Sequence, residues 1–262
     1  GKGLNQSLAL ARSGAEVHHV GAVGADGGML LDVLKASGVH TEGTKSLSGA
    51  SGHAVIQVDQ NGQNNIIICG GANDSVSKEM IDEAVKEVEE GDIVLLQNEI
   101  SNVGYAAETA KKAGAKVALN PSPINENLKT IPMNLVDYFI LNEIEGKEIS
   151  GAESEEPEEI MEKLKTKYPD AAFVLTLGEN GSWYFDKTRC FKQDIYKVKA
   201  VDTTAAGDTF CGYFLSGITK GREIPEILKT ASAASAIAVS RNGAAPSIPE
   251  YEEVEKFVAE RG

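Results

Sequence analysis

Residues 138–149 read Tyr-Phe-Ile-Leu-Asn-Glu-Ile-Glu-Gly-Lys-Glu-Ile, an apolar run that passes without a linker into an amphipathic segment. A short continuous apolar run is typical of a strand that is buried on both faces. The polar start of the next segment, Asn142 followed by acidic residues, suits the first turn of a helix. A buried strand that leads directly into a helix is the repeating unit of α/β proteins, so this stretch decides the fold class.

The same alternation extends in both directions and predicts an α/β fold in which a mainly parallel sheet is sandwiched by helices. The predicted strands are Val17–Val23, Ile93–Gln97, Lys116–Leu119, Tyr138–Leu141 and Phe173–Leu177. The helices predicted between them are Asn5–Ser13, Met29–Ser37, Lys78–Val88, Asn102–Lys112, Glu143–Ile149 and Glu158–Tyr168. The last third is predicted to form three helices in series, at Gly207–Thr219, Pro225–Ser240 and Pro249–Arg261.

Residues 40–70 interrupt this alternation. Two β-rich segments, Ser51–Asp59 and Asn64–Cys69, are joined by Gln60–Gln63, which contains the Asn-Gly pair of a tight hairpin turn. The pattern leaves open whether this hairpin is a lid over a cleft or only an edge hairpin. We predict an α/β core made of residues 1–39 and 71–262, and a small β lid made of residues 40–70.

Acidic residues outnumber basic ones by 39 to 25, which gives a formal net charge of −14. This balance argues against nucleic acid or an anionic membrane as a partner, because both bind basic surfaces. No apolar run approaches the ~20 residues of a membrane span. The three cysteines form no CxxC pair, and the four histidines show no zinc-ligand spacing. We therefore expect a cytoplasmic protein without a metal site built on cysteine and histidine.

Residues 201–210, Val-Asp-Thr-Thr-Ala-Ala-Gly-Asp-Thr-Phe, combine three small residues with an acid at the start of a predicted helix. Small residues let a phosphate approach the unpaired amides of a helix N-terminus. A carboxylate within such an anion site needs a function, and a general base beside a transferred phosphoryl group is one. The alternative is that Asp208 is only a first-turn acid that stabilises the helix.

Three other segments have the composition of ligand sites. Residues 1–6, Gly-Lys-Gly-Leu-Asn-Gln, contain glycines that let a polar ligand approach the backbone closely, and an asparagine amide that can bind hydroxyl groups. The sequence contains neither a P-loop pattern nor the dinucleotide-binding GxGxxG pattern. Asn142 and Glu145 follow a strand, where a carboxylate could hold Mg²⁺ through water. In isolation, the pattern favours the alternative of a helix cap, Asn142, followed by first-turn acids. Residues 176–181 end another strand with glycines that could border a nucleotide or form a simple turn.

Taken together, residues 1–6, 20–26, 142–145 and 202–210 occur in the order and spacing of the ribokinase family of carbohydrate kinases, which this chain resembles over essentially its whole length. The resemblance implies ATP-dependent phosphorylation of the primary hydroxyl of a pentose, with D-ribose converted to D-ribose 5-phosphate as the first expectation. Deoxyribose, fructose and nucleoside kinases are the nearest alternatives. A non-catalytic protein that binds nucleotide or sugar is the alternative from another class.

The resemblance also assigns roles to single residues. Asp208 resembles the base that accepts the proton of the sugar hydroxyl, and the amides of Ala205, Ala206 and Gly207 resemble the anion hole for the transferred group. The expected sugar contacts are Gly1, Lys2, Gly3, Asn5, Glu99 and Asp208. The expected ATP contacts are Asn142, Thr176, Gly178, Gly181, Gly207 and Ser232. Glu145 matches the residue that binds the water shell of Mg²⁺.

Members of this family are also activated by a monovalent cation, here expected to be K⁺. The matching ligand positions are Asp202, Thr204, Ala238, Arg241, Gly243 and Ser247, although residues 244–247 could equally be a simple turn before the last helix. The resemblance further implies a homodimer that forms through the lid. Family members carry a first central strand and a sugar-gripping aspartate before the Gly-Lys-Gly motif. If no such segment exists outside this chain, we expect it to bind ATP more tightly than ribose.

Overall fold

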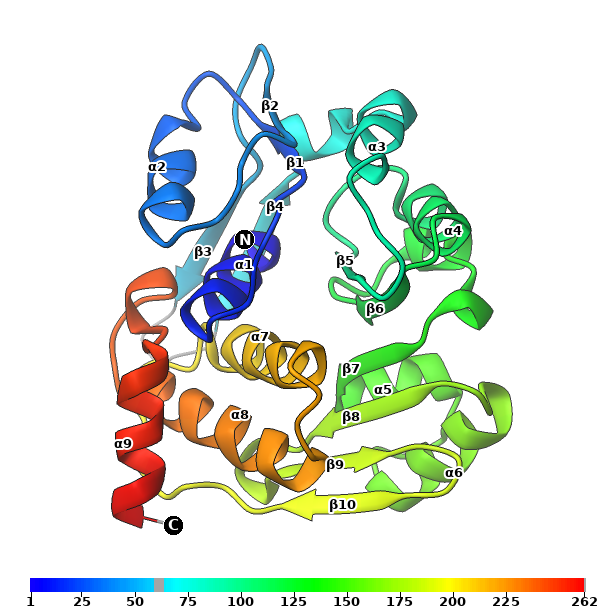
Figure 1. Ribbon diagram of the computed structural model, residues 1–262, viewed down its shortest axis with the longest axis vertical. Helices are drawn as coiled ribbons and strands as arrows, with labels where there is room; N and C mark the ends of the chain where they lie inside the picture. The colour runs from blue at the N-terminus through cyan, green and yellow to red at the C-terminus, as the bar shows by residue number, and fades with distance from the viewer. Residues whose placement is uncertain (59–63, 262) are drawn as a thin grey trace.

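A six-stranded sheet forms the centre of the protein in the computed structural model, which describes residues 1–58 and 64–261 (Figure 1). Its strands, in spatial order, are β10 (Cys190–Gln193), β9 (Ser182–Phe185), β8 (Ala172–Thr176), β7 (Tyr138–Asn142), β6 (Lys116–Asn120) and β5 (Ile93–Gln97). Strands β5 to β8 are parallel, while β9 and β10 add an antiparallel edge. The predicted α/β fold with a mainly parallel sheet is confirmed.

Helices cover both faces of this sheet (Figure 1). In the described residues the helices are, in chain order, α1 (Lys2–Arg12), α2 (Gly28–Ala36), α3 (Lys78–Val85), α4 (Val103–Lys112), α5 (Glu143–Ser150), α6 (Pro157–Lys167), α7 (Ala206–Thr219), α8 (Ile224–Val239) and α9 (Tyr251–Arg261). One buried cluster joins the sheet to α4, α5 and α6, and a second joins it to α7 and α8. Within the described residues, no helix is both long and apolar enough to cross a bilayer.

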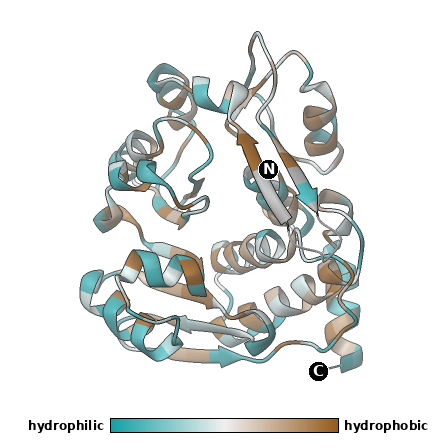
Figure 2. Cartoon of the chain, turned by 180° about the vertical axis from the view of Figure 1, so that it is seen from behind, coloured by the Kyte–Doolittle hydropathy of each residue, from teal (hydrophilic) through white to brown (hydrophobic). Residues whose placement is uncertain are grey.

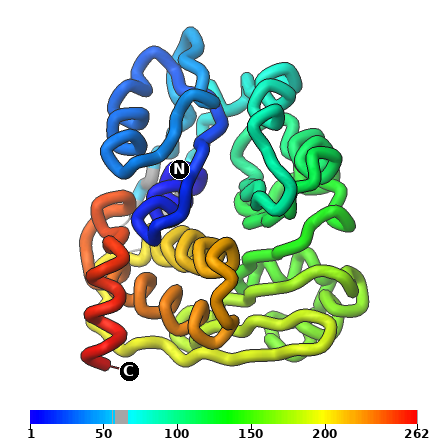
Figure 3. The backbone as a smooth tube through the Cα atoms, in the orientation of Figure 1, coloured from blue at the N-terminus to red at the C-terminus, as the bar shows by residue number. Residues whose placement is uncertain are grey.

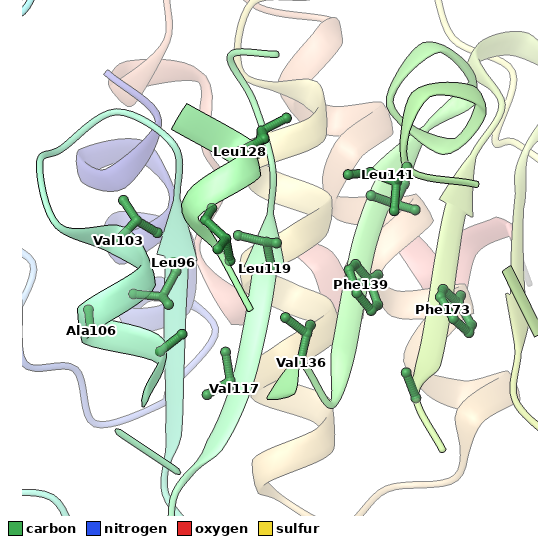
Figure 4. Packing of buried hydrophobic residues seen from close by; sticks show 14 of the residues in the cluster. Leu96, Val103, Ala106, Val117, Leu119, Leu128, Val136, Phe139, Leu141 and Phe173 are labelled. Atoms are coloured by element: carbon green, nitrogen blue, oxygen red, sulfur yellow. The ribbon is translucent and has the colours of Figure 1, made fainter. Parts of the chain in front are cut away.

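The central strands are apolar on both faces because each face meets a different layer of helices. Phe139 and Leu141 of β7 belong to the cluster on the α5 side, whereas Ile140 between them belongs to the cluster on the α7 side. The rings of Phe139 and Phe173 stack with their centroids 5.3 Å apart. Figure 4 shows these side chains standing in one row across neighbouring strands. This packing explains why residues 138–142 form an uninterrupted apolar strand that ends at a polar residue.

Two small sheets lie outside the central one. β1 (Gly21–Val23) pairs in parallel with β2 (Thr44–Ser46), and β3 (His53–Val58) pairs in antiparallel fashion with β4 (Asn64–Cys69). The β3–β4 pair confirms the predicted hairpin, while its predicted Gln60–Gln63 turn lies outside the described residues. Figure 2 shows hydrophobic stretches along the hairpin strands, whose exposed apolar side chains include Val55, Ile67 and Ile68. The role of residues 40–70 as a lid stays a prediction.

The structure differs from the prediction in a few elements. The segment Val17–Val23 was expected to be a strand of the parallel sheet, but only β1 within it is a strand, and its partner is β2. Strands β2, β9 and β10 were not predicted, because each spans only three or four residues and β2 is wholly polar. Helix α3 ends at Val85, whereas the prediction extended it to Val88.

A close helix contact joins the first part of the chain to the last. Helices α1 and α7 lie side by side, and the N-terminal tube in Figure 3 lies against α7. At Gly212 of α7, an added Cβ atom would lie 2.4 Å from the Cβ atom of Ala9 and 2.7 Å from the backbone nitrogen of Leu10. The two helices can therefore approach this closely only because position 212 lacks a side chain.

We predict that Gly212→Ala destabilises the protein by about 1–3 kcal/mol, because the new methyl group forces α1 away from α7. Urea unfolding followed by circular dichroism measures this change. Gly28→Ala is the matched control, since an added Cβ at Gly28 of α2 has no heavy atom within 4 Å. Equal stabilities of the two variants would contradict the close contact.

Candidate active site

The carboxyl ends of four neighbouring parallel strands carry polar side chains. Gln97 ends β5 opposite Asn120, which ends β6, and Asn142 ends β7 opposite Thr176, which ends β8. Ligands of open α/β sheets bind beyond this edge. The sheet therefore places four polar residues in one row at the edge where a site is expected.

Asp208 lies in the first turn of α7, and its side chain is only 5% exposed. Its carboxylate accepts a hydrogen bond from Nδ2 of Asn5 at 2.9 Å on Oδ2, and one from Nε2 of Gln6 at 2.9 Å on Oδ1. The ammonium group of Lys2 lies 3.8 Å from Oδ1. A first-turn acid needs none of these partners, so α1 holds this carboxylate in a defined polar environment.

Two amide side chains connect Asp208 to Glu145 of α5. Nε2 of Gln6 also donates to Oδ1 of Asn120 at 3.1 Å, and Nδ2 of Asn120 lies 3.3 Å from Oε2 of Glu145. Nε2 of Gln97 donates to Oε1 of Gln6 at 2.6 Å, which orients the Gln6 amide. Gln6, Asn120 and Gln97 were not among the predicted site residues. The position of Asn120 directly after a predicted strand was the available signal, as it was for Asn142.

Glu145 and Asn142 form a capping box at the start of α5. The backbone N–H of Glu145 donates to Oδ1 of Asn142 at 2.8 Å, and the N–H of Asn142 donates to Oε2 of Glu145 at 3.1 Å. The alternative reading of Asn142 as a helix cap is thus correct, and it leaves Glu145 almost completely buried. Burial raises the pKa of the Glu145 carboxyl group. Its carboxylate oxygens are of the ligand type that Mg²⁺ prefers.

The predicted anion hole lies at the N-terminus of α7, next to Asp208. The N–H of Ala206 donates to the carbonyl oxygen of Thr203 at 3.2 Å. The N–H of Gly207 has no acceptor among residues 1–58 and 64–261, and an added Cβ at Gly207 would meet nothing within 4 Å. Ala205 is buried. An amide without an acceptor at a helix N-terminus suits an anion, and the space on the Cβ side of Gly207 leaves room for one to approach.

Residues predicted to bind the sugar surround the start of α1. The N–H of Gly3 donates to Oε2 of Glu99 at 3.3 Å. An added Cβ on Gly1 would lie 3.2 Å from the same oxygen. The structure therefore brings Gly1, Gly3 and Glu99 together, while Lys2 and Asn5 of the same helix face Asp208.

The residues predicted to bind the nucleotide are less closely grouped than those predicted to bind the sugar. Asn142 and Thr176 are paired across β7 and β8. Gly178 and Gly181 adopt positive φ angles of 54° and 85° in the turn after β8. Ser232 is buried on α8, which packs against α7, the helix that carries Gly207.

The two segments predicted to bind a monovalent cation do meet. Oδ2 of Asp202 accepts a hydrogen bond from the N–H of Gly243 at 2.9 Å, and Oδ1 accepts one from the N–H of Thr204 at 2.9 Å. The Thr204 hydroxyl and these backbone groups lower the pKa of Asp202. The carbonyl oxygen of Ala238 accepts from the N–H of Arg241, and the Ser247 hydroxyl donates to the carbonyl oxygen of Ala244. Carbonyl and carboxylate oxygens are the donor types that a hard cation takes.

A parallel sheet whose strand ends face a buried carboxylate at a helix N-terminus is the arrangement of a phosphoryl-transfer enzyme of the α/β class. The family model of the pfkB family carbohydrate kinases matches residues 1–251. This chain belongs to that family.

Individual relatives agree with this assignment. The chain is 33% identical to a ribokinase from Haemophilus influenzae, over 98% of this chain and 86% of the relative. It is 29% identical to a deoxyribokinase from Salmonella typhi, over 99% of this chain and 87% of the relative. Its fold is similar to that of Arabidopsis thaliana ribokinase complexed with ribose and ATP, with a TM-score of 0.85 and 31% identity over 98% of this chain and 86% of that one.

We predict that Glu145→Gln stabilises the fold at neutral pH. Because the pKa of Glu145 is raised in the folded state, the ionised carboxylate costs stability above that pKa, and the cost disappears as the pH falls toward the unfolded value. The advantage of the variant in unfolding free energy should therefore grow from pH 5 to pH 8 in urea titrations. Glu148→Gln, at an exposed position of the same helix, is the control and should show no such growth. A variant less stable than wild type at pH 8 would contradict the prediction.

Proposed function

We propose that this chain catalyses the ATP-dependent phosphorylation of the primary hydroxyl group of a pentose, with D-ribose as substrate. The observation that carries the proposal is the buried carboxylate of Asp208, which α1 holds beside the open N-terminus of α7. The higher identity to a ribokinase than to a deoxyribokinase favours ribose over deoxyribose. The bound ribose and ATP named for the Arabidopsis structure support the same pair of substrates.

In this mechanism Asp208 accepts the proton of the sugar hydroxyl group while the oxygen of that hydroxyl group attacks the γ-phosphorus of ATP. A new oxygen–phosphorus bond forms, the bond to the ADP oxygen breaks, and the proton stays on the Asp208 carboxyl group. The amides of Ala205, Ala206 and Gly207, together with the α7 dipole, stabilise the charge on the transferred group. Ala206 must exchange its hydrogen bond to Thr203 for one to the anion.

The sugar lies against the start of α1, where Gly1, Gly3 and Glu99 meet. Lys2 and Asn5 serve both the sugar and Asp208, because their side chains already face this carboxylate. ATP extends from Gly207 along the strand ends, past Asn142 and Thr176 to Gly178, Gly181 and Ser232. Glu145 would hold Mg²⁺ through water, and Mg²⁺ bound there would supply positive charge for the phosphates.

Asp202, Thr204, Ala238, Arg241, Gly243 and Ser247 would hold a monovalent cation, K⁺, mostly through carbonyl oxygens. An ion bound there would supply positive charge beside the loop that leads to Ala205, without touching either substrate. The β3–β4 hairpin closes over the sugar and pairs with a second copy in a homodimer. Its exposed apolar side chains support this role. We place the enzyme in the cytoplasm, in keeping with its free cysteines.

Asp208→Asn should lower kcat for ribose phosphorylation about 10²–10⁴-fold, because the amide cannot accept the proton. Ribose-dependent ADP release measures kcat, and calorimetry with ADP checks that the variant still binds nucleotide. Asp32→Asn, at an exposed position of α2, is the matched control. Turnover that survives the change at Asp208 would remove the mechanism. Nucleotide binding without turnover in the wild type would favour the non-catalytic alternative.

Asp202→Asn should raise the KCl concentration needed for half-maximal activity about tenfold, because the amide offers the cation a weaker oxygen ligand. The same ADP-release assay, run from 0 to 200 mM KCl at constant ionic strength with tetramethylammonium chloride, measures this shift. Activity of the wild type that is independent of KCl would contradict the cation site and leave the role of Asp208 intact.

A further inference from the structure

Two histidines that are far apart in the sequence stand next to each other outside the site described above. His18, in the connection from α1 to β1, forms a parallel bridge with His40, which follows α2. The backbone hydrogen bonds from His19 N–H to His40 O and from His40 N–H to Val17 O, each 2.8 Å, hold the pair in register. The two imidazole rings stack with their centroids 4.5 Å apart and an interplanar angle of 15°. The backbone thus places two imidazole nitrogens side by side.

A carboxylate completes the group. Oε1 of Glu16 lies 3.6 Å from Nε2 of His18 and 3.9 Å from Nε2 of His40. One ligand atom from each of the three residues lies within 4.8 Å of the other two. In the part of the chain that the structure describes, no lysine or arginine nitrogen lies within 4 Å of this carboxylate. Both histidine nitrogens therefore face one carboxylate oxygen that has no competing permanent cation.

We propose that Glu16, His18 and His40 form a binding site for a divalent transition-metal ion, with Zn²⁺ as its ligand. Two imidazole nitrogens and one carboxylate oxygen are a donor set that suits Zn²⁺, whereas Mg²⁺ takes oxygen ligands. All three side chains are exposed, so their side-chain torsions can change to direct the three ligand atoms at one ion. The site is separate from the cation ligands of the kinase reaction.

The exposure of the three side chains decides what kind of site this is. His18 is 59% exposed, His40 47% and Glu16 79%. Water fills the remaining coordination positions of the ion, so the ion exchanges with solvent, unlike the ion of a closed structural site. The excess of acidic residues in the chain raises the local concentration of cations. The bound ion links the segment after α1 to the segment after α2, which stabilises the folded state.

This proposal departs from the expectation that no metal site is built on cysteine and histidine. That expectation followed from spacing along the chain, whereas strand pairing brings His18 and His40 together. The neighbouring His19 is not a ligand. Its Nδ1 shares a hydrogen bond with the Ser7 hydroxyl at 2.8 Å, and burial lowers its pKa to about 4.

The test is titration calorimetry with ZnCl₂ on the full chain in a Cys69→Ser/Cys190→Ser background, because both of these thiols are exposed and could bind Zn²⁺ themselves. We expect one Zn²⁺ per chain with a dissociation constant in the micromolar range. His18→Ala and His40→Ala should each weaken binding at least tenfold. His53→Ala, which removes another exposed histidine, should leave it unchanged.

A second measurement is the Zn²⁺-dependent rise in the thermal midpoint, which should be present in the background protein and absent in His18→Ala. This readout needs no kinase activity, so it is independent of the proposed function. Binding only at millimolar ZnCl₂, or binding that neither histidine substitution weakens, would overturn the proposal.

Discussion

Two buried carboxylates, Asp208 and Glu145, determine how the elements of the site must meet. A buried carboxylate without hydrogen-bond partners costs several kcal/mol, so each must be supplied with donors. Gln6 and Asn120 supply them and also join the two acids into one chain of hydrogen bonds. The donors belong to α1 and β6, while the acids belong to α7 and α5. These four elements can therefore satisfy their buried polar groups only when all of them are in place.

The sheet provides the rigid frame for this arrangement. Strands β5 to β8 are covered on both faces, so they cannot slide without exposing an apolar row such as the one around Phe139. Each strand ends in a polar residue at the same edge, and after β7 the helix α5 begins there directly. A rigid frame with adaptable ends allows one family of kinases to keep its chemistry while the sugar pocket changes.

The sequence predicts the elements between residues 93 and 167 well, because their strands are continuous apolar runs and their helices carry local start signals. Short polar strands such as β2 have no such signal. Asp208, Glu145 and Asn142 could be predicted because they stand at helix starts. Asn120 follows a predicted strand just as Asn142 does, so its place at this edge had a signal, but its hydrogen bond with Gln6 joins residues 114 positions apart and had none. Likewise, no sequence motif predicts which strands pair when they lie far apart in the chain.

The hydrogen bond between Asn5 and Asp208 spans 203 positions of the chain. During translation, α1 leaves the ribosome long before α7 is made, and domains fold as their segments become complete. The polar face of α1 therefore cannot contact Asp208 until α7 has been synthesised. The polar surroundings of Asp208 are therefore incomplete until both ends of this contact have been synthesised.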